Sequence, residues 1–401
     1  MMQSLQDVYI VAATRSPVGK APRGMLRSVR PDDLLAHMIR AALAHVPTLD
    51  PAAIQDAVIG CARPEGSQGL NVARLGALLA GLPDTVAGMT VNRFCASGLS
   101  AIALAADRIR VGEADVMLAG GVESMSQVPM MGYAPSFSPS VFANDENIGI
   151  AYGMGLTAER VAQQWQVSRE DQDAFALRSH QRALDAQKAG EFDDEISSVA
   201  VTLRAPDLTQ GTGQSVQAGV AFTRDEGPRA DTSAEALARL KPVFAARGSV
   251  TAGNSSQTSD GAAVLLLASE RAIRDHGLNP LARYVGCAVR GVAPDIMGIG
   301  PRVAIPAALD QAGLSLDQMD WIELNEAFAA QSLAVIRDLD LDPAKVNPLG
   351  GAIALGHPLG ATGAIRAATL IHALRRHGLK HGMVTMCVGT GMGAAGIFER
   401  L

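Results

Sequence analysis

Short apolar runs typical of buried strands alternate with longer amphipathic stretches over the first 120 residues. One such stretch, which begins at Ser97, places Leu99, Ile102 and Ile109 on one helical stripe. This alternation predicts a mostly parallel sheet with helices on its faces, and therefore an α/β protein. The predicted strands are 8–13, 57–62, 85–91 and 115–120, and the predicted helices are 32–46, 71–80 and 97–111.

The pattern changes between residues 122 and 247. Residues 125–133 are rich in Met, Pro and Gly, and residues 158–189 are typical of helix, with a helix-start signal at Ser168. Residues 207–219 are polar and rich in glycine, which predicts a loop. The region has no strong strand periodicity, so we expect an insertion that could cover a site.

The α/β alternation resumes after Ser249, and the two α/β regions look like copies of one unit. Val91-Asn92, a turn, a helix and a strand ending in Gly121 correspond to Val346-Asn347, a turn, a helix and a strand followed by Gly391. The predicted domains are 1–121 with 248–270, an inserted 122–247, and 271–401. In this second region the predicted strands are 264–268, 282–292, 321–324, 383–388 and 393–399, and the predicted helices are 270–276, 303–313, one from 327, and 360–377.

The composition of the chain limits which macromolecules it is expected to bind. The 401 residues are 48% hydrophobic and 18% charged with a net charge of −6, which argues against nucleic acid or an anionic membrane as the main partner. No run approaches 18 apolar residues, so no membrane span is expected. Cys61, Cys95, Cys287 and Cys387 are widely spaced, without metal-ligand or redox spacing. We therefore expect a reduced, cytoplasmic protein without a bound metal.

Cys95 stands where a predicted strand gives way to the helix that begins at Ser97. Free backbone N–H groups and the helix dipole stabilise an anion at such a corner, which predicts a thiolate near neutral pH. The alternative is a small buried hydrophobic residue, which is common for free cysteine.

Three further segments set polar or sulfur groups at element junctions. His357 lies between glycines ahead of a helix, Cys387 ends a strand beside a Gly-rich turn, and Asn325 precedes a helix. Structural alternatives are a buried thiol for Cys387 and a helix cap for Asn325. Together the set fits acyl transfer through a thioester, with Cys95 as nucleophile, His357 as its base and Cys387 as a second acid/base. Asn325, through a water, and the amides of Cys95 and Gly389 would stabilise oxyanions.

These segments, with Gly120–Ser126 and Asn325–Phe328, resemble the thiolase family over essentially the whole chain. The resemblance implies a duplicated five-layer α-β-α-β-α fold with an inserted loop domain over coenzyme A. It also implies a homo-oligomer, either a dimer or a tetramer, that cleaves 3-oxoacyl-CoA with CoA as a substrate and uses no other cofactor.

The resemblance extends to binding residues. Ser256 aligns with a serine near the pantetheine arm, and Arg229 with a basic residue near the CoA phosphates. Met154 and Met297 align with residues that line the acyl pocket. Ala252, in the small polar stretch that holds Ser256, completes the expected CoA-contacting set.

One departure bears on the substrate. Short-chain biosynthetic thiolases usually carry histidine at the position of Gly153, so the smaller residue predicts room beyond the 3-oxo group. Residues 254–257 also resemble the degradative enzymes, so we expect a 3-ketoacyl-CoA thiolase of fatty-acid β-oxidation. Alternatives are an acetoacetyl-CoA or 3-oxoadipyl-CoA enzyme and, more remotely, a ketoacyl-synthase-type condensing enzyme or a non-catalytic CoA- or lipid-binding protein.

Overall fold

A computed structural model describes residues 5–207 and 213–401. Within these ranges no helix is long and apolar enough to cross a membrane. The principal strands are β1 (Val8–Arg15), β3 (Asp56–Gly60), β4 (Ala87–Val91), β5 (Val116–Ser124), β6 (Val199–Asp207), β7 (Gly213–Phe222), β8 (Ser259–Ser269), β9 (Ala282–Gly291), β10 (Trp321–Leu324), β11 (His381–Val388) and β12 (Met392–Arg400). The helices are α1 (Pro31–Ala44), α2 (Val72–Leu79), α3 (Ser97–Arg110), α4 (Met154–Gln164), α5 (Arg169–Ala189), α6 (Ala234–Ala238), α7 (Glu270–His276), α8 (Pro301–Ala312), α9 (Ala329–Asp338), α10 (Ala352–Leu355) and α11 (Leu359–Arg376).

The strand pairing confirms the predicted duplication. In the N-terminal half the order is β1-β8-β5-β3-β4, with β1–β8 and β8–β5 antiparallel and the last two pairs parallel. In the C-terminal half β9-β12-β11-β10 follows the same sequence of antiparallel and parallel pairs. A parallel bridge between Ile322 and Val346 takes the place of the β3–β4 pair. Val8–Ile10 of β1 also pair with β9, which joins the halves.

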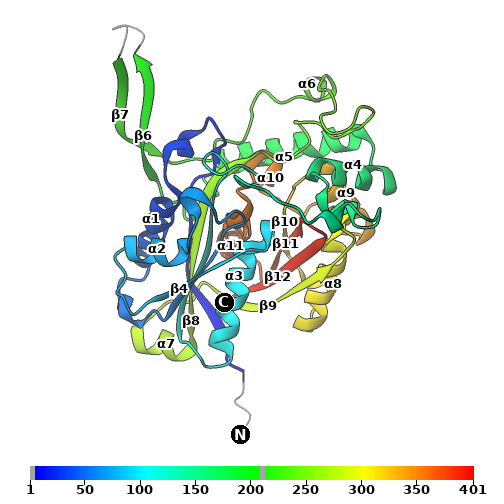
Figure 1. The fold of residues 1–401 in the computed structure, drawn as a ribbon. Coiled ribbons are helices and arrows are strands. Elements are labelled where there is room, and N and C mark those ends of the chain that lie inside the picture. Colours follow the sequence, from blue (N-terminus) through cyan, green and yellow to red (C-terminus); the bar gives the residue numbers. More distant parts are fainter. Residues whose placement is uncertain (1–4, 208–212) are drawn as a thin grey trace.

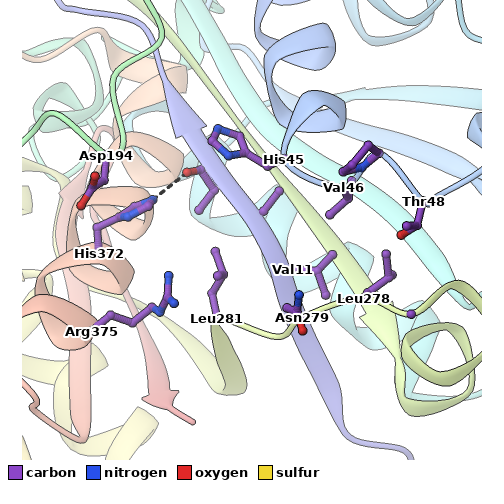
Figure 2. A pocket seen from close by; sticks show the side chains of 14 residues that line it. Val11, His45, Val46, Thr48, Asp194, Leu278, Asn279, Leu281, His372 and Arg375 are labelled. Carbon is purple, nitrogen blue, oxygen red and sulfur yellow. Dashed lines mark hydrogen bonds between the residues drawn. The ribbon is translucent and has the colours of Figure 1, made fainter.

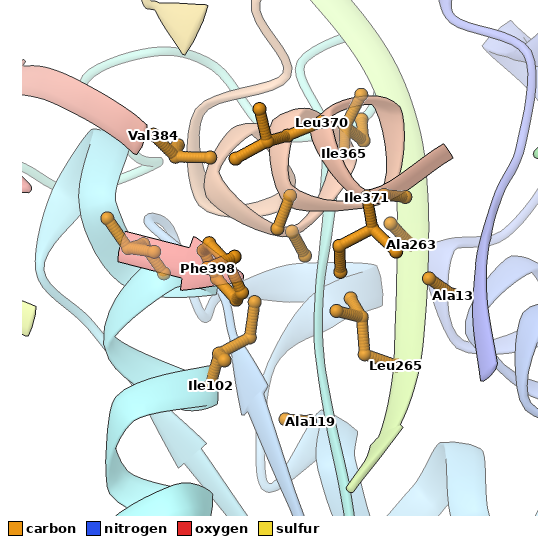
Figure 3. Close-up of a cluster of buried hydrophobic side chains, with 14 of the residues drawn as sticks. Ala13, Ile102, Ala119, Ala263, Leu265, Ile365, Leu370, Ile371, Val384 and Phe398 are labelled. Atoms are coloured by element: carbon orange, nitrogen blue, oxygen red, sulfur yellow. The ribbon is translucent and has the colours of Figure 1, made fainter. Parts of the chain in front are cut away.

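The two halves enclose a shared helical layer. Helices α3 and α11 pack against each other and against strands of both halves, whereas α1 and α2 cover the outer face of one half and α8 the outer face of the other (Figure 1). Figure 3 shows Ile365 and Ile371 of α11 gathered with Ile102 of α3 and Phe398 of β12 in one buried cluster. This arrangement is the expected five-layer α/β architecture.

Glycines let the first turns of α3 and α11 touch. A Cβ atom at Gly98 would lie 2.8 Å from the backbone nitrogen of Ala364, so any side chain there would push the helices apart. Cys95 and His357 each lie three residues before a glycine of this contact, Gly98 and Gly360. The duplicated fold therefore brings both corners to the same end of the central layer.

The middle region corrects two sequence predictions. The helical stretch 158–189 is two helices, α4 and α5, separated by a turn in which Gln166 has φ 51°; α5 does begin at the predicted cap, Ser168. The predicted loop 207–219 holds strand β7 from Gly213, and residues 208–212 lie outside the described residues. β6 and β7 form a hairpin that projects from the body (Figure 1). Residues 215–219 are all exposed, so apolar and polar side chains do not alternate here as they do along a half-buried strand. These residues therefore carry no strand signal in the sequence.

Candidate active site

Cys95 lies in a single turn of 3-10 helix, Phe94–Ala96, between β4 and α3. Local hydrogen bonds hold this corner: the Asn92 side chain accepts from the backbone N–H of Phe94 at 2.8 Å, and the Ser97 hydroxyl donates to the Phe94 carbonyl at 2.7 Å. Phe94 has φ 44°, an uncommon conformation for an aromatic residue. These hydrogen bonds therefore hold the turn that carries Cys95 in a strained conformation.

The resting state of Cys95 differs from the sequence prediction. The side chain is only 7% exposed, and burial raises the pKa of the thiol to about 11, although the N–H groups of Gly389 and of Cys95 itself act in the opposite direction. The prediction of a preformed thiolate is therefore wrong. Loss of water around a buried anion outweighs the donors at the helix start. Cys95 must be deprotonated during attack, by a nearby base.

His357 has the properties of that base. It follows α10 and Gly356, which has φ 95°, and its ring is 5% exposed. Burial, with the charge of Arg366, lowers the pKa of His357 to about 3, so the ring is neutral near pH 7.

The hydrogen bonds of His357 select one tautomer. Asn325 Nδ2 lies 3.4 Å from Nε2, and Thr362 Oγ1 lies 2.7 Å from Nδ1. An amide nitrogen can only donate, so Nε2 carries the lone pair and Nδ1–H donates to the Thr362 hydroxyl. Nε2 is thus unprotonated, as a proton acceptor must be, and the 3.4 Å contact from Asn325 is long enough to be given up when the ring takes a proton. The Asn325 carbonyl oxygen is buried without a hydrogen-bond partner among the described residues, which suits a bound water.

Cys387 is the last residue but one of β11 and is wholly buried. Burial raises the pKa of its thiol well above the ordinary value, and the nearby Cys95 raises it further. The two thiols lie close together because the turn Phe94–Ala96 packs against β11, and the Gly389 amide reaches Cys95 from the turn that follows Cys387. Two cysteines far apart in sequence thus share one site.

Apolar side chains surround Cys387. Met297 and Phe328 belong to its buried cluster, and Met154 packs against it. The Phe244 ring meets Phe328 edge to face at 6.0 Å. Met154 and Phe244 come from the middle region, which therefore reaches the site.

The predicted binding residues fall into two groups. The backbone N–H of Ser256 donates to the Ala327 carbonyl at 2.9 Å, beside the Asn325 turn, so Ser256 lies next to the site. Arg229 is exposed and pairs with Asp231 at 2.9 Å, and Ala252 is exposed on a turn. Among the described residues, no hydrogen bond or ion pair joins Arg229 or Ala252 to the two thiols or to His357.

Sequence reasoning missed several residues that hold the site. Thr362 orients His357, and the Cys387 thiol donates to Gln331 Oε1 at 3.9 Å. Glu123, 1% exposed, accepts from the backbone N–H of Gly360 at 2.8 Å and so ties the start of α11 to β5. Thr362 follows His357 by five residues at a helix start, a spacing that could have suggested the contact. Gln331 carried no such signal.

A separate pocket of about 550 Å³ lies on another part of the molecule. It is bounded by β1, the segment after α1 and the second half of α11, and Figure 2 shows His372 and Arg375 facing Val11 and Leu281 across it. His372 is hydrogen-bonded to the Ala13 carbonyl at 2.9 Å. None of the predicted site residues is among its described lining residues, so this pocket is distinct from the site around Cys95.

Known proteins agree with this geometry. Residues 8–271 match the model of the thiolase N-terminal domain, and residues 278–400 match that of the thiolase C-terminal domain. The chain is 50% identical over 395 residues to a 3-ketoacyl-CoA thiolase of Bacillus subtilis, covering 98% of this chain and all of that protein. It is 47% identical over 412 residues to a beta-ketoadipyl-CoA thiolase of Pseudomonas aeruginosa, covering 99% of this chain and all of that protein.

Solved structures give the same assignment. The crystal structure of human mitochondrial 3-ketoacyl-CoA thiolase superposes with a TM-score of 0.88 at 40% identity, covering all of both chains. The same human enzyme in complex with CoA gives a TM-score of 0.87 at 40% identity, covering 100% of this chain and 99% of that chain. The fold, the paired corners and these matches together mean that the chain belongs to the thiolase family of acyltransferases.

Proposed function

We propose that the protein is a 3-ketoacyl-CoA thiolase that cleaves 3-oxoacyl-CoA with CoA, in fatty-acid β-oxidation. One observation carries the proposal: a buried thiol, Cys95, lies close to a second buried thiol, Cys387, in a site where Asn325 and Thr362 contact the ring nitrogens of a His357 that burial keeps neutral. Acyl transfer that also breaks a carbon–carbon bond needs a nucleophile, a base for it and a separate acid for the carbon.

In the first half-reaction the Cys95 proton moves to His357 Nε2 while the sulfur attacks the 3-oxo carbon. The bond between carbons 2 and 3 breaks, and its electron pair becomes the enolate of acetyl-CoA. This enolate takes the proton of the Cys387 thiol. Acetyl-CoA leaves, and the shortened acyl group stays on Cys95 as a thioester.

In the second half-reaction the incoming CoA thiol gives its proton to the Cys387 thiolate and attacks the Cys95 thioester. The departing Cys95 sulfur recovers its proton from His357. The N–H groups of Cys95 and Gly389 would stabilise one oxyanion, and His357 with a water on Asn325 the other. Both half-reactions together return every residue to its starting state.

Two features favour a fatty acyl substrate. A Cβ at Gly153 would meet no atom within 4 Å, so there is open space beside Met154. The cluster around Met154, Met297 and Phe328 is apolar, which suits a hydrocarbon tail.

The second candidate is a 3-oxoadipyl-CoA thiolase, and the 47% identity to the Pseudomonas aeruginosa enzyme favours it. Its substrate ends in a carboxylate, which is costly to bury without a cationic partner. We place it second because the side chains grouped around Cys387 are apolar.

We also propose that the working form is a homo-oligomer, at least a dimer. β4 is the last strand of the sheet and pairs with β3 on one side only within the described residues. Apolar side chains are exposed near this edge, with Leu70 at 89% and Met89 at 38%. An exposed apolar edge strand readily pairs with a second chain. Light scattering would show a dimer or tetramer, and Met89→Lys would weaken it.

The remaining predictions continue as proposals. The three domain ranges rest on the α/β alternation and a cytoplasmic location on the spacing of the cysteines, whereas the roles of Ser256, Arg229 and Ala252 in holding CoA rest on the resemblance. The proposed reaction needs CoA as a substrate and no other cofactor.

The deciding experiment measures the two half-reactions separately. Cys387→Ala should still take an acetyl group from acetyl-CoA on Cys95, detected as added mass, because a thiolate such as that of CoA can leave without being protonated. It should cleave no 3-oxoacyl-CoA, because the carbon of the enolate cannot leave without a proton donor. Cys95→Ala should do neither. Near wild-type cleavage by Cys387→Ala would refute the mechanism, and comparing 3-oxoacyl-CoAs of increasing length with 3-oxoadipyl-CoA would separate the two candidates.

A further inference from the structure

Gln331, in the first turn of α9, has its side chain confined beside Cys387. It is wholly buried, and the Cys387 thiol donates to its Oε1 at 3.9 Å. A Cβ at Gly298 would lie 2.7 Å from the Cβ of Gln331, so the facing backbone packs directly against this side chain. The residue therefore cannot turn away to solvent.

The other end of the same amide is unsatisfied. Gln331 Nε2 is buried with no hydrogen-bond partner among the described residues, whereas Oε1 also lies 3.4 Å from the hydroxyl of Ser332. Buried polar groups without partners are uncommon and call for an explanation. The unpartnered Nε2 belongs to the same amide whose Oε1 contacts the Cys387 thiol. That thiol changes its protonation state during the proposed reaction.

A thiol can donate a hydrogen bond, but a thiolate can only accept one. A glutamine amide offers an acceptor and a donor of nearly equal size, so a half-turn about its last bond exchanges them without needing extra volume. Resting on the proposed function, we propose that Gln331 is a positioning residue that matches both protonation states of Cys387. Oε1 accepts from the thiol, and after proton delivery Nε2 donates to the thiolate.

The need for such a donor follows from the surroundings of Cys387. Its side chain is 0% exposed and lies among apolar residues, so water cannot solvate the anion. Burial and the neighbouring Cys95, the titratable group that faces it, both raise the pKa of the Cys387 thiol, and its own backbone N–H is the donor that opposes them. A second donor would make the thiolate accessible at working pH.

The test compares Gln331→Met, Gln331→Glu and a matched control, Gln172→Met. Gln172 is also a wholly buried glutamine with one unpartnered amide atom among the described residues, but its Nε2 donates to the Val167 carbonyl and to the Ser249 hydroxyl. Each protein is assayed for acetylation of Cys95 by acetyl-CoA and for exchange of the acetyl α-protons with deuterium oxide. The proposed function assigns the exchange to Cys387 and the acetylation to Cys95.

We expect Gln331→Met to acetylate within about twofold of wild type and to exchange about ten- to a hundredfold more slowly, the effect of losing one hydrogen bond to a charged group. The pH of half-maximal exchange should rise by about one unit. Gln331→Glu has nearly the same shape, and burial raises the pKa of its carboxyl, which donates only while it is protonated. Its selective loss of exchange should therefore deepen as the pH rises, and it decides the matter if Gln331→Met does not fold.

Wild-type exchange in both Gln331 variants, an equal loss in both assays, or the same selective loss in Gln172→Met would overturn the role of Gln331. Two other results would instead contradict the proposed function: no acetylation of Cys95 in the wild-type protein, or full exchange by Cys387→Ala. The two failures are therefore distinguishable.

Discussion

Replacing Thr362 with valine should slow the acylation of Cys95 without unfolding the protein. Thr362 is 1% exposed, and its hydroxyl accepts from Nδ1–H of His357 at 2.7 Å. Valine has almost the same shape but no hydroxyl, so the variant leaves a buried imidazole N–H without its partner. An unsatisfied buried donor costs about 1–3 kcal/mol. This cost falls on the reactive tautomer, so acylation should slow by about five- to 150-fold.

The assay is the single-turnover rate of acetyl transfer from acetyl-CoA to Cys95, followed by intact mass. Thr369→Val is the matched control, because Thr369 lies on the same helix, is also 1% exposed and also makes a 2.7 Å hydrogen bond, but to Glu195. Both variants should lose some resistance to urea. Only Thr362→Val should acetylate slowly. Equal acetylation rates in the two variants would refute the assignment of the tautomer and of Thr362 as its anchor.

Four further predictions follow from the same structure. Because burial raises the pKa of Cys95 to about 11, its alkylation by iodoacetamide in the free enzyme should keep accelerating up to about that pH, and a rate that levels off below pH 8 would contradict this. Because the pKa of His357 is lowered to about 3, the unfolded chain binds a proton that the folded chain does not; resistance to urea should fall as pH drops from about 6.5, and less so in His357→Gln. Gly153→His should fold normally, since a Cβ there meets no atom within 4 Å, and should slow cleavage of long 3-oxoacyl-CoAs more than of the C4 substrate; an unchanged chain-length profile would count against the acyl site. Arg15 forms buried ion pairs with Glu195 at 2.5 Å and with Asp225 at 2.8 Å. Arg15→Met would leave both carboxylates buried without a cation, so it should lower the free energy of unfolding, measured in urea, by about 3–5 kcal/mol. A loss below about 1 kcal/mol would show that the pairs are solvated.

Most regular elements could be predicted because their periodicity is local. The strand Trp321–Leu324 and the helix Glu270–His276 have the predicted bounds, and α3 and α11 differ from prediction by a residue at their ends. The exceptions are of two kinds. Outside the middle region, β8 begins at Ser259, before its predicted start at 264, and the short helix α10 was not predicted. The others lie in the middle region. The break at Gln166 interrupts a continuous helical pattern, and the pairing of β7 with β6 depends on backbone hydrogen bonds that leave no apolar signature.

The residues of the active site also fall into those that the sequence identifies and those that it does not. Cys95, His357, Asn325 and Cys387 could be selected from the sequence because glycines and element junctions mark each of them. Their partner Thr362 is suggested only by its spacing from His357, whereas Gln331 could not be selected, since it is identified only by the thiol that it touches across the fold.

The sequence by itself determined the duplicated α/β pattern, the family and the residues that carry the chemistry, because these depend on local periodicity and short motifs. Only the tertiary structure decided the protonation of the site. Burial of Cys95 and Cys387 keeps both thiols protonated, and burial of His357 keeps its ring neutral. The physical reason is desolvation, which depends on everything packed around a group and outweighs the helix-start donors that the sequence displays.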